Sequence, residues 1–150
     1  MPHSRYEWLR SIKAVEREHW ATRLATSRFV IAAQEDPAVL EGDLTLRDIR
    51  HAAERLEGTY LIRLFAVFET GLRRFWSTVR RTDPPIRTRD LLDGIAATRR
   101  VPAPRLFDAH AVREYRNAIV HARDEAVTPV SMEDARRSLC RFLSFLPPRW

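Results

Sequence analysis

Apolar side chains in the first part of the chain recur at steps of three to five residues, the spacing of one face of an α-helix. They begin at Trp8 and continue to Val30, and they predict a helix over about 4–33. The following segment, 34–43, contains a proline and a glycine and is predicted to be a loop.

A second helical pattern is unusually long. Thr45-Leu-Arg-Asp48 has the form of a capping box, so we expect a helix to begin near Leu46, and the apolar pattern continues to Val79. At ~1.5 Å per residue this stretch would measure about 54 Å, against roughly 40 Å for the diameter of a compact domain of this size. Either the bundle is elongated or Gly58 interrupts the helix.

Three shorter helices follow in the pattern. We expect one over about 89–99 capped by Thr88, one over about 105–122, and a last one that starts at the capping box Ser131-Met-Glu-Asp134 and ends before Pro147. No segment alternates apolar and polar residues as a half-buried strand does. The prediction is therefore an all-α fold, an antiparallel bundle of about five helices with a long second helix, in one domain over 1–150.

Composition fits this picture and narrows the class of protein. Hydrophobic residues make up 45% and charged residues 31% of the 150 residues, as in an ordinary globular domain. Cys140 is the single cysteine, so we expect no internal disulfide and no zinc site, and we place its side chain in the core. No segment is apolar enough for a leader or a membrane span, so we expect a soluble cytoplasmic protein without a membrane partner.

The net charge of +6 comes from the middle of the chain. Residues 73–105 hold nine basic and three acidic residues, whereas the segments on either side nearly balance. Arginine forks bind phosphate in a bidentate manner, which makes nucleic acid the first partner to consider, with a merely solvated face as the alternative. The candidate RNA-binding residues are Arg73, Arg74, Arg80, Arg81 and Arg123.

The most informative stretch is Arg113-Glu-Tyr-Arg-Asn-Ala-Ile-Val-His-Ala-Arg123 on the fourth predicted helix. It combines Arg116 and Asn117 with His121, four intervening residues after the arginine. On a straight helix Arg116 and His121 point about 140° apart, so one helix cannot aim both at one atom. Either the helix turns at His121, or a second chain brings the two groups together.

This pattern resembles the R-x4-6-H signature of the HEPN superfamily, and the segment Leu64-Phe-Ala-Val-Phe-Glu69 is also similar to that family. The resemblance covers roughly residues 44–147. It implies a small all-α domain that acts as a metal-independent endoribonuclease without cofactors, in a toxin or phage-defence system. It also implies a two-fold homodimer in which the motifs meet at a shared cleft, and a possible neutralising antitoxin protein as partner.

Chemistry assigns a role to each residue of the motif. His121 is the expected general acid and base toward a ribose 2′-hydroxyl, Arg116 the phosphate ligand, and Asn117 the group that orients the imidazole or holds a phosphate oxygen. Glu69 is expected to fix the rotamer of Arg116 or Arg113 as a supporting carboxylate. In one branch of the family a tyrosine two residues after the histidine is modified; here that position is Arg123, which rules out such silencing.

Several other readings of the chain rank lower. His110 and Glu114 lie one turn apart but lack a third metal ligand, and no metal is expected. The aromatic residues, Trp8 and Trp20 among them, fall at helical spacing and are predicted to be core or dimer interface rather than a base-stacking platform. The alternative function is a non-catalytic helical module that binds RNA or a protein partner, and a third is a purely structural bundle.

Overall fold

The computed structural model describes residues 4–121 and 126–150, and it is helical throughout. Its elements are α1 (Arg5–Glu35), the short 3₁₀ helix η1 (Pro37–Val39), α2 (Leu46–Arg80), α3 (Thr88–Arg99), α4 (Ala103–His121) and α5 (Met132–Leu143). Within the described ranges the only strand-like pairing is an isolated bridge between Ser4 and Arg149. The predicted all-α bundle of five helices with a long second helix is confirmed.

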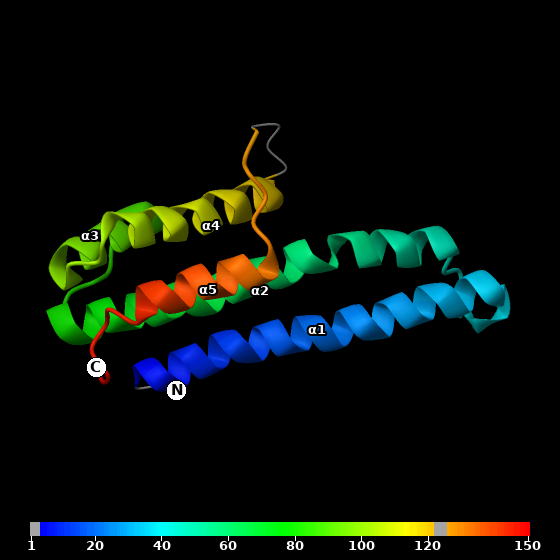
Figure 1. The fold of residues 1–150 in the computed structure, drawn as a ribbon, viewed down its shortest axis with the longest axis horizontal. Helices are drawn as coiled ribbons and strands as arrows, with labels where there is room; N and C mark the ends of the chain where they lie inside the picture. Colours follow the sequence, from blue (N-terminus) through cyan, green and yellow to red (C-terminus); the bar gives the residue numbers. More distant parts are fainter. Residues whose placement is uncertain (1–3, 122–125) are drawn as a thin grey trace.

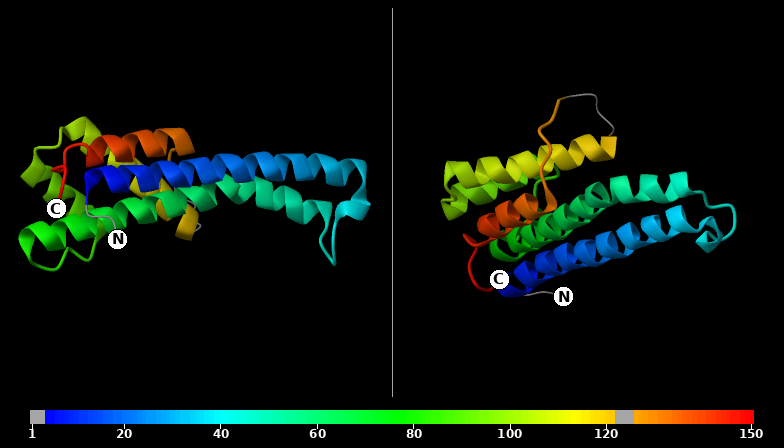
Figure 2. Two further views of the ribbon diagram at one scale, coloured as in Figure 1. Left: turned by 90° about the horizontal axis from the view of Figure 1, so that it is seen from below. Right: turned by 45° about the vertical axis from the view of Figure 1, so that its right-hand side comes forward.

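The helices form three layers with α2 and α5 in the middle. Helix α1 lies on one side of this pair, and α4, with α3 beside it, lies on the other (Figures 1 and 2). Helices α1 and α4 run in one direction, and α2 and α5 run in the opposite direction (Figure 1). Residues on α1 and on α4 therefore face solvent on opposite sides of the molecule.

The second helix is continuous, which settles the question raised by Gly58. All 35 residues of α2 belong to one helix, about 52 Å long at 1.5 Å per residue. Gly58 lies against the side chain of Ile119 on α4, and a Cβ built there would meet that side chain at an ordinary 3.5 Å. The bundle is therefore elongated, and the outer half of the α1–α2 hairpin extends beyond α4 and α5 (Figure 1).

Local capping explains where the helices begin, with one exception. Thr45 and Asp48 form the predicted capping box, and the Ser131 hydroxyl accepts a hydrogen bond from the backbone N–H of Asp134 at 3.1 Å. The predicted cap at Thr88 is wrong: this residue is the first of α3, and its hydroxyl donates to Glu69 at 2.8 Å. The Thr88 hydroxyl therefore bonds to the Glu69 carboxylate on α2 and does not cap α3.

The core follows the apolar face of α2. Phe65, Phe68 and Phe142 are fully buried, and Phe68 contacts the rings of the other two at 5.7 Å between centroids. The Trp8 ring packs so closely on Gly71 that a Cβ there would lie 3.0 Å from it. A glycine is needed at position 71 because α1 and α2 approach each other across an indole ring.

Trp20 departs from the expectation for the aromatic residues. Trp8 is buried, but the Trp20 side chain is 62% exposed and contributes nothing to the core of the chain. Trp20 is exposed because it follows the buried His19 by about 100° around α1 and lies on the same outward face as Tyr6, Arg10 and Arg17. No helix among the described residues is both long enough and apolar enough to cross a membrane.

Candidate active site

The sequence motif lies on the second half of α4. Arg116 and Asn117 are half-buried, whereas His121 is the last residue of the helix and is exposed. Because α4 is one continuous helix through His121, the two motif side chains keep their separation of about 140° around its axis. Helix α4 ends at His121, and the residues that follow lie outside the described part of the chain, so both ways to bring the two groups together stay predictions.

Arg116 is held on three sides. Its Nη1 donates to the Asn117 side-chain oxygen at 2.8 Å, its Nη2 lies 3.8 Å from Glu69 Oε2, and its guanidinium lies over the Phe65 ring, 5.4 Å from the centroid. The side chain is nevertheless 26% exposed. The guanidinium is thus held in place, and its buried Nε–H is left without a hydrogen-bond acceptor among the described residues.

Glu69 is the centre of a network that joins α2, α3 and α4. Its Oε1 accepts from Arg73 Nε at 3.0 Å, from Arg73 Nη2 at 2.7 Å and from the Thr88 hydroxyl at 2.8 Å. Its Oε2 faces Arg116, and the side chain is only 16% exposed. The expectation that Glu69 fixes the rotamer of Arg116 agrees with this geometry.

Asn117 has a different partner from the one expected. The sequence places its amide one turn before His121, within reach of the imidazole, but its oxygen accepts the hydrogen bond from Arg116. Neighbouring positions on a helix seldom bond, and here the long arginine side chain folds back because Glu69 and Phe65 hold it toward α2. Asn117 therefore positions the arginine and not the histidine.

Arg113 belongs to a second cluster, one turn earlier on α4. Its Nε donates to His110 Nδ1 at 3.3 Å, its Nη2 donates to Glu114 at 3.1 Å, and His110 Nε2 bonds to Asp93 at 2.7 Å. This arrangement fixes the neutral tautomer of His110, with the proton on Nε2. Both ring nitrogens are occupied, so the cluster ties α3 to α4.

Sequence reasoning missed Asp93, which is the carboxylate that contacts His110. The helical spacing of His110 and Glu114 suggested an incomplete metal site, but His110 bonds to Asp93 on α3. Among the described residues no group of three or more histidine, cysteine or acidic side chains is placed to hold a metal ion. No local signal points to Asp93, since the contact depends on how two helices pack.

Two basic residues of the middle segment, Arg73 and Arg80, have contacts within the chain. Arg73 uses all three guanidinium nitrogens within the chain, because Nη1 and Nη2 also donate to the backbone carbonyls of Pro85 and Ile86. Arg80 stacks on Trp76 at 4.1 Å and bonds to Thr98. To bind a phosphate through either residue, these internal contacts would have to be given up.

The other predicted RNA-binding residues differ in their surroundings. Arg74 is half-buried on α2, and Arg81 is exposed in a left-handed conformation, with φ 55°, where α2 ends. Arg123 lies outside the described residues. The sequence expectation for these three residues stays a prediction.

Cys140 lies at the contact between α5 and α1 and is partly buried. Burial raises the pKa of its thiol, and the charges of Arg136 and Lys13 oppose this shift only in part. A raised pKa keeps the sulfur protonated near neutral pH, which disfavours a role as nucleophile. This agrees with the assignment of Cys140 to packing.

Comparison with known proteins adds no relative to this picture. No family model, no curated protein and no solved structure matches the chain. The function must therefore be argued from the residues themselves.

Proposed function

We propose that this protein is a metal-independent endoribonuclease of the HEPN type that acts as a homodimer. In this proposal Arg116 binds the scissile phosphate and His121 is the general acid and base. Glu69 and Asn117 hold the arginine, and Arg113 fixes the preceding turn of α4. The resemblance of the Arg116 to His121 spacing to the family signature motivates this assignment.

The observation that carries the proposal is the way in which Arg116 is held. A carboxylate, an amide and an aromatic face fix its guanidinium, yet it stays 26% exposed and its Nε–H lacks an acceptor. Arg116 Nε is one of five buried side-chain nitrogens without a partner among the described residues, and it is the one that belongs to the motif. A preorganised guanidinium fork is what stabilisation of the charge on a reacting phosphate requires.

The reaction would use the neighbouring hydroxyl of the RNA itself. His121 takes the proton of a ribose 2′-hydroxyl, the 2′ oxygen attacks the phosphorus, and the bond to the 5′ oxygen of the next nucleotide breaks. A protonated imidazole returns a proton to that leaving oxygen. The products are a cyclic 2′,3′-phosphate and a free 5′-hydroxyl, and DNA is not cut because it lacks the attacking group.

The proposal uses a second copy because the Arg116 and His121 side chains point about 140° apart on α4. The outward stripe of α4 contains Phe107, Ala111, Glu114, Ala118 and His121, at helical steps of four, three, four and three residues. Phe107 on this stripe is 73% exposed. A two-fold contact along the stripe would cover Phe107 and bring His121 to the interface, but Arg116 points about 180° away from the stripe, so the shared cleft would form at the edge of this contact.

The direct test is cleavage of mixed single-stranded RNA in excess chelator. We expect the parent chain to cut, and His121→Ala and Arg116→Ala each to lose at least about 100-fold in rate. His51→Ala, which changes an exposed histidine on α2, is the matched control and should cut at the parental rate. Folded His121→Ala and Arg116→Ala proteins that cut like the parent would refute the site.

A mixing experiment tests the shared cleft. Each inactive variant carries the group that the other lacks, so a mixed dimer has one site with both groups intact. Equal mixing gives half mixed dimers with one working site each, so about a quarter of the parental activity should return. No return of activity would refute a cleft built from two chains.

A second candidate function is a non-catalytic module that binds RNA or a protein partner. The observation that favours it is the internal engagement of Arg116 by Glu69 and Asn117, which also suits a purely structural arginine. RNA that binds but stays uncut would select this alternative. In either case the proposed setting is a cytoplasmic toxin or defence system, with a neutralising protein as the partner to look for.

A further inference from the structure

A regular stripe of cations and aromatic side chains lies on the exposed face of α1. Tyr6, Arg10, Lys13, Arg17 and Trp20 follow one another at steps of four, three, four and three residues. At about 100° per residue these five positions fall within an arc of roughly 80°, and at 1.5 Å per residue they extend over about 21 Å. We call these five residues the α1 stripe.

The three cations of the α1 stripe are not used to build the fold. Arg10, Lys13 and Arg17 are exposed and form no hydrogen bond or ion pair with any residue that the structure describes. Like charges three and four residues apart on a helix repel each other. No hydrogen bond or ion pair among the described residues gives a reason for this spacing of the three cations.

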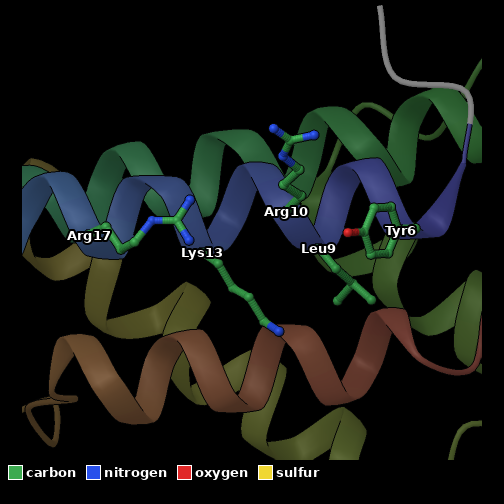
Figure 3. Close-up of a pocket in the computed structure, with 5 residues that line it drawn as sticks. All are labelled: Tyr6, Leu9, Arg10, Lys13 and Arg17. Atoms are coloured by element: carbon green, nitrogen blue, oxygen red, sulfur yellow. The ribbon is translucent and has the colours of Figure 1, made fainter.

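The stripe borders a hollow rather than a flat surface. A depression of about 380 Å³ is lined by Tyr6, Leu9, Arg10, Lys13 and Arg17, without any acidic residue. In Figure 3 the Lys13 side chain extends toward α5, whereas Arg10 leaves α1 on the other side. The positive charge is thus spread across the exposed face of α1, and Leu9 is the aliphatic residue that lines the depression.

Exposed aromatic rings stand at both ends of the cations. The Tyr6 side chain is 72% exposed and that of Trp20 is 62% exposed, although both are large enough to be buried with advantage. A line of cations flanked by exposed rings is the pattern of surfaces that bind single-stranded nucleic acid, in which cations follow the phosphates and rings stack on bases. The length of the stripe equals about six stacked nucleotides at 3.4 Å each.

We propose that the α1 stripe is a binding track for single-stranded nucleic acid, separate from the α4 cluster. Arg10, Lys13 and Arg17 contact consecutive backbone phosphates, and Tyr6 and Trp20 stack on bases at the two ends. Because α1 and α4 lie on opposite sides of the bundle, the track anchors the strand away from the proposed cleft (Figures 1 and 2). The choice of RNA as the natural strand rests on the proposed function; the binding itself does not.

The test measures binding without cleavage. Fluorescence anisotropy follows a labelled 12-nucleotide single-stranded RNA with the His121→Ala chain in excess chelator, at several salt concentrations. The triple change Arg10→Gln, Lys13→Gln and Arg17→Gln should weaken binding at least about tenfold and reduce the salt slope by about 2, from three phosphates at about 0.7 each. The control triple Arg47→Gln, Arg50→Gln and Arg55→Gln removes the same charge from exposed arginines on α2, which form no side-chain hydrogen bond or ion pair with the described residues, and should change affinity less than about twofold.

The rings have a test of their own. Tyr6→Ala with Trp20→Ala should weaken RNA binding about tenfold but leave the binding of inorganic polyphosphate, which has no bases, within about twofold. Equal losses for RNA and polyphosphate would overturn the stacking role.

Other outcomes separate this proposal from the proposed function. The track would be overturned if the stripe triple and the control triple lost RNA affinity equally. It would also be overturned if the stripe triple bound anionic vesicles more weakly but bound RNA like the parent. A parent chain that binds RNA through the stripe but never cuts it would refute the nuclease and leave the track standing. Circular dichroism of each variant checks that α1 is still folded.

Discussion

The arginines around Glu69 and the cations on α1 have the same charge but opposite relations to the fold. Arg73 and Arg116 are half-buried and their guanidinium groups bond to side chains or carbonyls of the chain. Arg10 and Arg17 are exposed and bond to nothing that the structure describes. A guanidinium can thus act as internal packing or as an external ligand, and the count of charges in a segment does not say which.

The largest effect should come from the shape of the Arg116 side chain. Arg116→Lys keeps the charge but loses the fork that Asn117 and Glu69 hold, so the rate of RNA cleavage should fall by about 100-fold or more. Arg63→Lys, on an exposed arginine paired with Glu18, is the control and should leave the rate unchanged. Cleavage assays in chelator measure both, and an active Arg116→Lys protein would contradict the role of the fork.

The next effect concerns the stability of the network. Glu69→Gln keeps the size of the side chain but removes the charge that Arg73 and Arg116 share, so the free energy of unfolding should fall by about 2 kcal/mol. Glu18→Gln removes an exposed ion pair and should cost less than about 1 kcal/mol. Urea unfolding compares the two, and equal losses would mean that the network adds nothing beyond a surface pair.

A smaller effect compares single arginines of the two regions. Arg73→Gln breaks contacts to Glu69, Pro85 and Ile86 and should lower the free energy of unfolding by about 1–2 kcal/mol. Arg17→Gln relieves repulsion from Lys13 and should leave stability unchanged or raise it by about 0.2–0.5 kcal/mol. If Arg17→Gln destabilised the chain as much as Arg73→Gln, the contrast between the two regions would be lost.

The smallest expected effect is that of the Lys13 charge on the pKa of the Cys140 thiol. Burial raises the pKa of the thiol while the charge of Lys13 lowers it, so Lys13→Gln should raise that pKa further. The rate of Cys140 alkylation at pH 8 should then be lower than in the parent, by less than about twofold. In the parent itself the folded thiol should react more slowly than the thiol of the chain unfolded in urea. Faster alkylation in Lys13→Gln would contradict the contact.

The sign of the pH dependence follows from the same shift. Because the pKa of Cys140 is higher in the folded chain, its contribution to stability is complete below the unfolded value of about 8.5 and is lost as the pH rises through the folded value. Cys140→Ala should remove this alkaline loss in urea titrations. An unchanged loss would assign it to another group.

The sequence predicts features that depend on neighbours along the chain. The capping box at Thr45 and the N-cap at Ser131 set helix starts correctly because their donors and acceptors lie within one turn. The pairing of Glu69 with Arg116 also agrees with expectation, since both lie on the inward faces of adjacent helices.

Features that depend on packing between helices escape the sequence pattern. Thr88 bonds to Glu69 instead of capping α3, and His110 bonds to Asp93 instead of Glu114. Trp20 is exposed because it lies on the outward face of α1, and the spacing of the aromatic residues alone does not show which face of a helix is inward. Whether a given arginine is occupied depends on the same three-dimensional information, so the basic middle segment and the α1 stripe could not be ranked in advance.

The unequal cover of the α1–α2 hairpin has a consequence for how the molecule loosens. Helix α5 begins where the backbone N–H of Met132 donates to Glu57, and beyond this point the two long helices pack mainly against each other (Figure 1). Backbone amides in these outer turns should exchange with solvent through local opening, well before those around Phe65. The tip of the α1–α2 hairpin can therefore unfold and refold locally while Arg116, the proposed phosphate ligand, stays in place.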